Sequence, residues 1–298
     1  MPFTNSLKTW MTQIRAPFLL LAVFLVAIGG AAAHHDGIFN PLRFFLCMIG
    51  IVLTHIAVNL CNELSDYRTG IDQHTRRTPF SGGSGSLQAG KTTYAAVRSV
   101  AIASLAVAAI IGCYLGVVSG PLVFFFMIAG GLTIVSYTPR LARWGFGEAA
   151  AGLCLGSFVV AGAYYAMAGT LSAGVLVASV PPGILTALLL FLNEFPDVEA
   201  DRAGGRRHLV IRLGYRGAAT LYAIAIAVTY LVIVAGVCFR LLPAMLLLGC
   251  LTIPLAIKVS IEAFRSGNLF EKFIPTMGMN VLIVLGTDLL LAAAYILS

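Results

Sequence analysis

Long apolar runs dominate this sequence, and short polar stretches separate them. Nine of the runs are long enough to cross a lipid bilayer as α-helices. Some connections are very short, such as Ser119-Gly120 and Gly169-Thr170, and these predict tight antiparallel hairpins. The predicted spans cover residues 17–33, 42–62, 95–117, 121–137, 147–168, 172–193, 217–238, 242–261 and 274–297.

The composition of the chain agrees with this pattern. Hydrophobic residues make up 59% of the sequence, charged residues only 10%, and the mean hydropathy is +0.94, whereas soluble domains carry about 25% charged residues. We therefore expect an all-α integral membrane protein in which most helix faces meet lipid or another helix. The six cysteines lie singly, without CxxC or CxxH spacing, so the sequence suggests neither a zinc site nor a disulfide framework.

The distribution of Lys and Arg predicts the orientation of these spans. With a cytoplasmic N-terminus, 17 of the 19 basic residues fall on the cytoplasmic side, and only Arg43 and Arg240 fall on the other. This is a strong positive-inside signal. The formal net charge of +7 is then a signature of membrane topology, and we expect no nucleic-acid partner.

Clusters of carboxylate and amide side chains lie at the predicted cytoplasmic ends of two spans. The first contains Asn59, Asn62, Glu63 and Asp66, and the second lies within residues 193–201. At about 100° per residue, positions 59, 63 and 66 share one helix face, and so do positions 193, 197 and 201. Each cluster can therefore direct several oxygens toward one point.

The two clusters also repeat each other. Asn62-Glu63-x-x-Asp66 recurs as Asn193-Glu194-x-x-Asp197, at an offset of 131 residues (193 minus 62). Each copy ends the second helix of a predicted four-helix unit, so we interpret the pattern as an internal repeat with the active cleft between its halves. The predicted fold is a single polytopic domain over residues 1–298, with two pseudo-repeated four-helix units and a ninth helix. Three long cytoplasmic loops, 63–94, 137–146 and 194–216, are predicted to cap the central cleft.

Two facing clusters of this kind suit a magnesium-bound diphosphate. Isolated carboxylates at membrane depth are costly, so they normally pair, face a wet cavity or hold cations. Mg²⁺ prefers oxygen ligands and commonly shares its shell with substrate phosphates. If the organic part of the diphosphate is an allylic prenyl chain, cleavage of the carbon–oxygen bond gives a stabilised carbocation. Exclusion of water would then let an aromatic acceptor capture it.

Both motifs resemble those of a known family. The sequence reads Asn-x-x-Asn-Glu-x-x-Asp-Tyr-Arg-x-Gly-x-Asp over residues 59–72 and Asn-x-x-x-Asp-x-Glu-x-Asp-Arg-x-x-Gly-Arg-Arg over residues 193–207. This pair is similar to the UbiA superfamily of intramembrane prenyltransferases. Within it, the Gly70-Ile-Asp72 ending and the run over residues 197–214 look most like the 1,4-dihydroxy-2-naphthoate polyprenyltransferases of menaquinone synthesis. The resemblance covers essentially the whole chain.

This resemblance implies a Mg²⁺-dependent enzyme that transfers a prenyl group from an isoprenyl diphosphate to an aromatic acceptor. It places the enzyme in the bilayer of a prokaryotic plasma membrane, with the N-terminus and the active site on the cytoplasmic side. It implies catalytic roles for Asp66, Asp197 and Asp201. The implied ligands of two diphosphate-bridging Mg²⁺ ions are Asn59, Asn62, Glu63, Asp66, Asp72, Asn193, Asp197 and Asp201. The implied diphosphate clamps are Arg76, Arg77, Arg140 and Arg206, and the further residues expected to line the cleft are Arg15, His55 and Tyr137.

Two features depart from the family's pattern. The family usually has Asp at the position of Glu63, so this carboxylate has an arm one methylene longer. The Ser- and Gly-rich loop 78–86 is not typical of the naphthoate enzymes, and it fits a phosphate-cradling lid as well as a flexible linker. The acceptor therefore stays open between dihydroxynaphthoate, 4-hydroxybenzoate, homogentisate, a tetrapyrrole and glycerol phosphate. His74 and His208 are expected to be ordinary loop residues.

Two other functions fit parts of the pattern. Intramembrane acids within repeats also describe an ion-coupled transporter, although a carrier would place them near the midplane and not beneath arginine-rich loops. A CDP-alcohol phosphotransferase also combines aspartates with Mg²⁺, but its Asp-Gly-x-x-Ala-Arg signature is absent from this sequence. The enzyme interpretation explains both motifs and the loop arginines together.

Overall fold

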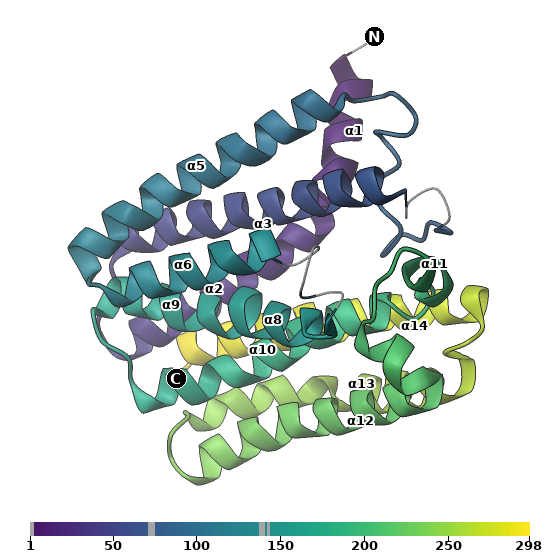
Figure 1. Ribbon diagram of the computed structural model, residues 1–298. Helices are drawn as coiled ribbons and strands as arrows, with labels where there is room; N and C mark the ends of the chain where they lie inside the picture. The colour runs from purple at the N-terminus through teal and green to yellow at the C-terminus, as the bar shows by residue number, and fades with distance from the viewer. Residues whose placement is uncertain (1–2, 71–74, 137–140, 142–143) are drawn as a thin grey trace.

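A computed structural model describes residues 3–70, 75–136, 141 and 144–298, and every regular element within these ranges is a helix (Figure 1). The first half contains α1 (Phe3–Gln13), η1 (Ala16–Phe18), α2 (Leu19–His35), α3 (Pro41–Thr69), α5 (Tyr94–Ser119) and α6 (Leu122–Ser136). It is followed by α8 (Gly147–Gly152), the π-helical turn η3 (Leu153–Ser157), α9 (Phe158–Ala168), α10 (Ala173–Asn193) and α11 (Val198–Ala203). The chain ends with α12 (Leu209–Cys238), the 3₁₀-helix η4 (Ala244–Thr252), α13 (Ile253–Ser266) and α14 (Phe270–Ile296).

In the part of the chain that the structure describes, eight helical segments are long and apolar enough to cross a membrane. They confirm eight of the nine predicted spans. The remaining prediction, 121–137, corresponds to α6, which is apolar but only 15 residues long. The count of nine spans and the repeat of two four-helix units stay predictions.

Two helices extend well beyond the apolar runs that predict them. α3 continues to Thr69 and so carries the whole first cluster. α12 begins at Leu209, eight residues before the predicted start, and a kink at Gly214, with a φ of 66° and a ψ of 167°, separates its first residues from the rest of the helix. A helix continues wherever its backbone hydrogen bonds are satisfied, whether or not its side chains are apolar. α3 begins at Pro41 with the Asn40 side chain accepting from the backbone N–H of Arg43, and it ends at Gly70 with a φ of 73°.

The most buried helices form the centre of the bundle. Between 50% and 67% of the apolar window is buried in the segments 16–35, 147–168, 173–193 and 270–296, against 22% in α5. Gly152 and Gly156 lie against Gly183 of α10, where an added Cβ would come within 2.7 Å of backbone atoms. This close approach is typical of packed membrane helices, in which small residues let two backbones meet.

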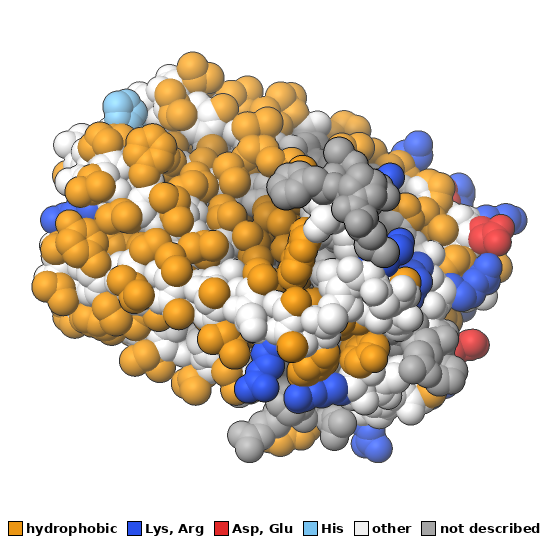
Figure 2. Space-filling view, turned by 90° about the horizontal axis from the view of Figure 1, so that it is seen from above, with side chains coloured by type: hydrophobic (Ala, Val, Ile, Leu, Met, Phe, Trp, Pro, Cys, Tyr) orange, Lys and Arg blue, Asp and Glu red, His pale blue; other side chains and the backbone are white. Residues whose placement is uncertain are grey.

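Polar elements gather at one end of the bundle. The C-terminal end of α3, the short helix α11 and the loops beside them lie at the same end in Figure 1. Figure 2 shows hydrophobic side chains over most of one face, with most of the visible Lys and Arg toward one end and edge. This division between an apolar body and a charged end is the arrangement expected for a helical membrane protein.

Candidate active site

Both polar clusters line one pocket of about 100 Å³, although they lie more than 120 residues apart in the sequence. α3 contributes Asn62 and Asp66, and the end of α10 contributes Asn193. Further lining residues come from the N-terminal segment, the 75–83 loop, and the stretch after α10; they are Arg15, Thr75, Phe80, Ser81, Gly82, Gly83, Leu190, Glu194, Asp197, Asp201, Arg206 and His208. The fold thus brings seven of the fifteen predicted site residues to one pocket, and they are Arg15, Asn62, Asp66, Asn193, Asp197, Asp201 and Arg206.

Arg206 joins the two clusters directly. Its Nη1 lies 2.9 Å from Oδ1 of Asp201, and its Nη2 forms an ion pair with Asp66. The side chains of Arg206, Asp66 and Asp201 are only 19%, 15% and 4% exposed, so water screens these pairs little. One guanidinium therefore links the first cluster on α3 to the second on α11.

The second cluster does not lie on one continuous helix, so the geometric basis of its prediction was wrong. α10 ends at Asn193, a turn containing Pro196 follows, and α11 begins at Val198. Proline lacks a backbone N–H and cannot extend a helix through this turn. All three residues still line the pocket, Asn193 from the end of α10, Asp197 from the turn and Asp201 from α11.

Buried oxygens without partners make this part of the pocket suitable for a cation. Oδ1 of Asn193 and Oδ1 of Asp197 are buried, and no described residue donates a hydrogen bond to either. Burial, followed by the neighbouring Asp201 carboxylate, raises the pKa of Asp197 to about 7. Burial, followed by the nearby Glu148 carboxylate, also raises the pKa of Glu194 well above its ordinary value. A bound cation would reverse both effects.

The side chains of the first cluster point in two different directions from α3. Asn62 and Asp66 line the pocket, whereas Asn59 and Glu63 contact other segments. Asn59 Nδ2 donates to the carbonyl of Ile14 at 2.9 Å, beside the pocket residue Arg15. The predicted metal ligands Asn59 and Glu63 thus lie outside the pocket lining, because their face of α3 packs against the N-terminal segment.

Glu63 connects three segments of the chain. Its Oε1 accepts from Nε2 of Gln13 at 3.0 Å and from Oγ of Ser84 at 2.6 Å, and its side chain is buried. Gln13 is itself fully buried and also donates to Oγ1 of Thr92 at 3.1 Å. The longer arm of Glu63 therefore reaches α1 and the Ser- and Gly-rich loop.

That loop is folded against the pocket. Oγ1 of Thr78 accepts from the backbone N–H groups of Phe80 and Ser81 at 3.1 and 2.8 Å. Gly82 follows with a φ of 87°, and a Cβ there would lie 2.9 Å from Cα of Arg77. Left-handed backbone and this close approach both require glycine. The loop is thus a built part of the pocket wall, which favours the cradle over the flexible linker.

The remaining predicted residues are placed elsewhere. Arg76 lies over the ring of Phe270 at 4.2 Å from its centroid and pairs with Glu271 at 3.4 Å, both on α14, because it is on the solvent side of the loop. The guanidinium of Arg77 packs beside Gly85 and does not line the pocket. His55 lines a separate apolar cavity. Asp72, Tyr137 and Arg140 lie outside the described residues.

The apolar cavity has a volume of about 360 Å³ and lies between α3, α5, α6, η3 and α9. Its lining includes the paired rings of Phe126 and Phe158, whose centroids are 5.2 Å apart, and its few polar groups include Thr54 and His55. Along α3, His55 lies about two turns from Asn62 in the polar pocket. Apart from His55, no sequence signal distinguished these lining residues from ordinary lipid-facing ones.

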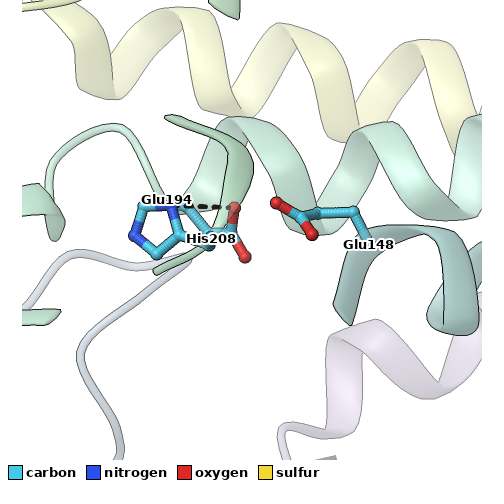
Figure 3. A group of neighbouring side chains, drawn as sticks. All are labelled: Glu148, Glu194 and His208. Carbon is cyan, nitrogen blue, oxygen red and sulfur yellow. Dashed lines mark ion pairs between the residues drawn. The ribbon is translucent and has the colours of Figure 1, made fainter. Parts of the chain in front are cut away.

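Two functional candidates were missed by the sequence prediction. Glu148 in the first turn of α8 and His208 before α12 meet Glu194, with one ligand atom of each within 4.8 Å of the others (Figure 3). His208 lies in the connection before α12, as predicted, but nothing in the sequence indicated that its side chain is buried beside Glu194 and Asp201. The signals available for this group were the place of Glu194 in the repeated Asn-Glu-x-x-Asp motif and an acidic residue, Glu148, at the beginning of an apolar span.

The profile of the UbiA prenyltransferase family matches residues 22–282. The chain belongs to this family. It is 28% identical over 243 residues to a 1,4-dihydroxy-2-naphthoate octaprenyltransferase of Bacillus subtilis, with 78% of this chain and 75% of the relative covered. It is 30% identical over 216 residues to the protein of the same name from Escherichia coli, and the match covers 70% of this chain and 69% of that relative.

Solved UbiA structures have the same fold. The apo structure of a UbiA homolog from Aeropyrum pernix superposes with a TM-score of 0.70 at 18% identity, covering 93% of this chain and 97% of the other. A UbiA homolog from Archaeoglobus fulgidus, solved with GPP and Mg²⁺, superposes with a TM-score of 0.61 at 16% identity. The superposition covers 97% of this chain and 100% of the other. The UbiA chain described here is therefore an integral membrane prenyltransferase, and family membership sets the transporter and phosphotransferase interpretations aside.

Proposed function

We propose that this UbiA enzyme transfers a prenyl group from an allylic isoprenyl diphosphate to an aromatic acceptor, with Mg²⁺ as its cofactor. The observation that carries the proposal is the convergence of both acidic clusters and two arginines, Arg15 and Arg206, on one pocket. An apolar cavity lies about two helical turns from this pocket, toward the N-terminal end of α3. The polar pocket suits the diphosphate, and the apolar cavity suits the prenyl chain.

The donor set of the pocket fits Mg²⁺. Its candidate ligands are carboxylate and amide oxygens, which this hard ion prefers, and two of them are buried oxygens without a hydrogen-bond donor among the described residues. When bound, Mg²⁺ would neutralise charge on the departing diphosphate. The residues proposed to hold it are Asn62, Asp66, Asn193, Asp197 and Asp201, with Asp72 expected from the family resemblance.

The protein's own residues would support cleavage in three ways. Arg15 and Arg206 would neutralise the diphosphate as the carbon–oxygen bond breaks and its electron pair moves to the diphosphate oxygen. The backbone of Gly82 and Gly83 would approach the phosphates closely. The apolar cavity would hold the rest of the prenyl chain and keep water away from the allylic carbon. The acceptor ring would then form the new carbon–carbon bond and lose a proton.

The proposed acceptor is 1,4-dihydroxy-2-naphthoate or a related quinone precursor, since relatives from Bacillus subtilis and Escherichia coli carry that name. The other UbiA acceptors named above are the alternatives. We also propose that the N-terminus and the pocket face the cytoplasm, because the basic residues gather on that side of the predicted topology.

A transfer assay with the purified protein tests this function. Mg²⁺ and a radiolabelled allylic diphosphate are supplied with either 1,4-dihydroxy-2-naphthoate or 4-hydroxybenzoate, and label is expected on the naphthoate alone. Asp66→Asn and Asp197→Asn should abolish transfer, while Glu199→Gln, which changes an exposed carboxylate on α11, is the matched control. Transfer to 4-hydroxybenzoate alone would contradict the proposal that 1,4-dihydroxy-2-naphthoate is the acceptor. Absence of Mg²⁺-dependent diphosphate binding would contradict the enzyme assignment of this pocket.

A further inference from the structure

Three side chains from three separate elements meet at one wall of the diphosphate pocket, where Glu194 and His208 are also lining residues. Glu148 comes from the first turn of α8, Glu194 from the end of α10, and His208 from the residue before α12. Figure 3 shows the Glu148 carboxylate directed at that of Glu194, with the His208 ring on the far side of Glu194. The three residues are 3%, 9% and 2% exposed, so this is an interior group and not a solvated acidic patch.

The group lacks the hydrogen-bond donors that buried carboxylates need. Oε2 of Glu148 and Oε2 of Glu194 are buried, and neither receives a hydrogen bond from any described residue. Oε1 of Glu148 accepts from the backbone N–H of Leu209 at 2.7 Å, and when one of the two carboxyl groups is protonated a side-chain hydrogen bond joins Glu148 to Glu194. A bound cation would take the place of that proton. Buried polar atoms are normally satisfied, and two unneutralised carboxylates so close together repel each other. The arrangement calls for a cation at their meeting point.

The histidine has the orientation of a metal ligand. Nδ1 of His208 faces the group, 3.4 Å from Oε2 of Glu194, while Nε2 lies 3.3 Å from Oδ2 of Asp201. Metal-bound histidines commonly donate their second ring N–H to a carboxylate, which sets the tautomer and directs the free nitrogen lone pair at the ion. Neither ring nitrogen of His208 makes a hydrogen bond with a described residue, and Asp201 is the carboxylate within reach of Nε2.

We propose that Glu148, Glu194 and His208 bind a divalent transition-metal ion of the Mn²⁺ or Zn²⁺ type, separate from the Mg²⁺ of the diphosphate pocket. An imidazole nitrogen with two carboxylate oxygens suits such ions, whereas Mg²⁺ prefers oxygen ligands alone. The ion would tie α8, α10 and the start of α12 together. Through His208 and Asp201 it would also hold one wall of the pocket in position.

Metal analysis of the full-length protein tests the proposal without reference to prenyl transfer. The protein, carrying a histidine-free affinity tag, is loaded with Mn²⁺ or Zn²⁺, dialysed against excess Mg²⁺ and assayed by elemental mass spectrometry. About one equivalent of the transition metal should remain. Glu148→Gln, whose amide oxygen can still accept from Leu209, and His208→Ala should lose it; Glu199→Gln and Asp197→Asn should keep it.

A spectroscopic measurement on the unmutated protein covers the case in which a variant fails to fold. Electron spin-echo spectra of the retained Mn²⁺ should show coupling to a ¹⁴N nucleus, and this coupling should be absent from an ion held only by the oxygens of Asn62, Asp66, Asn193, Asp197 and Asp201. Loss of all transition metal during dialysis would overturn the proposal and leave His208 as an ordinary ion-pair partner of Glu194 and Asp201. Retention without nitrogen coupling, or equal retention in every variant, would also overturn it.

Discussion

Arg206 is the only described side chain that pairs with both acidic clusters, so Arg206→Met tests how the pocket is held together. Methionine has a similar length but no charge. In the metal-free protein the substitution leaves the carboxylates of Asp66 and Asp201 facing each other without the guanidinium between them. The fold should loosen where α11 meets the end of α3.

The expected magnitude follows from burial. Two charge centres about 4 Å apart interact by about 4 kcal/mol at an effective dielectric constant of about 20. Removing one partner of a buried ion pair typically costs about 3–5 kcal/mol. Both carboxylates are at most 15% exposed, so we expect the free energy of unfolding without Mg²⁺ to fall by about 3–4 kcal/mol.

Magnesium should compensate part of this loss. A ligand at 100 times its Kd stabilises a protein by about 2.7 kcal/mol. In the unmutated protein Mg²⁺ must displace Arg206 from the two aspartates, whereas in the variant no guanidinium competes. The variant should therefore bind Mg²⁺ more tightly than the unmutated protein but bind the prenyl diphosphate more weakly, because one cation that would face the diphosphate is lost.

Unfolding in detergent with and without Mg²⁺, together with calorimetric titration of Mg²⁺, measures these effects. Arg76→Met is the matched control, because its pair with Glu271 has side chains 68% and 82% exposed and such surface pairs contribute about 0–1 kcal/mol. Weaker Mg²⁺ binding by Arg206→Met, or a loss of stability no larger than in the control, would refute the reasoning.

Three further predictions concern the N-terminal helix, the pocket and the apolar cavity. Gln13→Ala should lower the free energy of unfolding by about 1.5–3 kcal/mol, because it removes a hydrogen bond to the buried Glu63 carboxylate; an unchanged chemical unfolding curve would contradict this. Below the Asp197 pKa of about 7 a proton competes with Mg²⁺, so calorimetric Mg²⁺ affinity should rise from pH 6 to pH 8, and Asp197→Asn should flatten that slope. Gly131→Leu fills open space in the apolar cavity, where an added Cβ meets no atom within 4 Å. The value of kcat/KM should therefore fall more for long prenyl diphosphates than for short ones, and equal losses would mean that the prenyl chain does not occupy this cavity.

The sequence alone determined the membrane class, eight spans and the two polar clusters. These are local properties, because the length of an apolar run and the spacing of acids within one helix turn do not depend on the rest of the chain. The family resemblance rests on the same contiguous motifs and was confirmed by the family match over residues 22–282.

Only the tertiary structure decided which oxygens face the pocket. Asn59 and Asn62 are three residues apart on α3, yet one contacts the N-terminal segment and the other lines the pocket. Glu148 and His208 meet Glu194 only because α8 and α12 pack beside the end of α10. Which side chains turn toward one another depends on packing between distant segments, and helical periodicity supplies no information about which neighbour each face of a helix will meet.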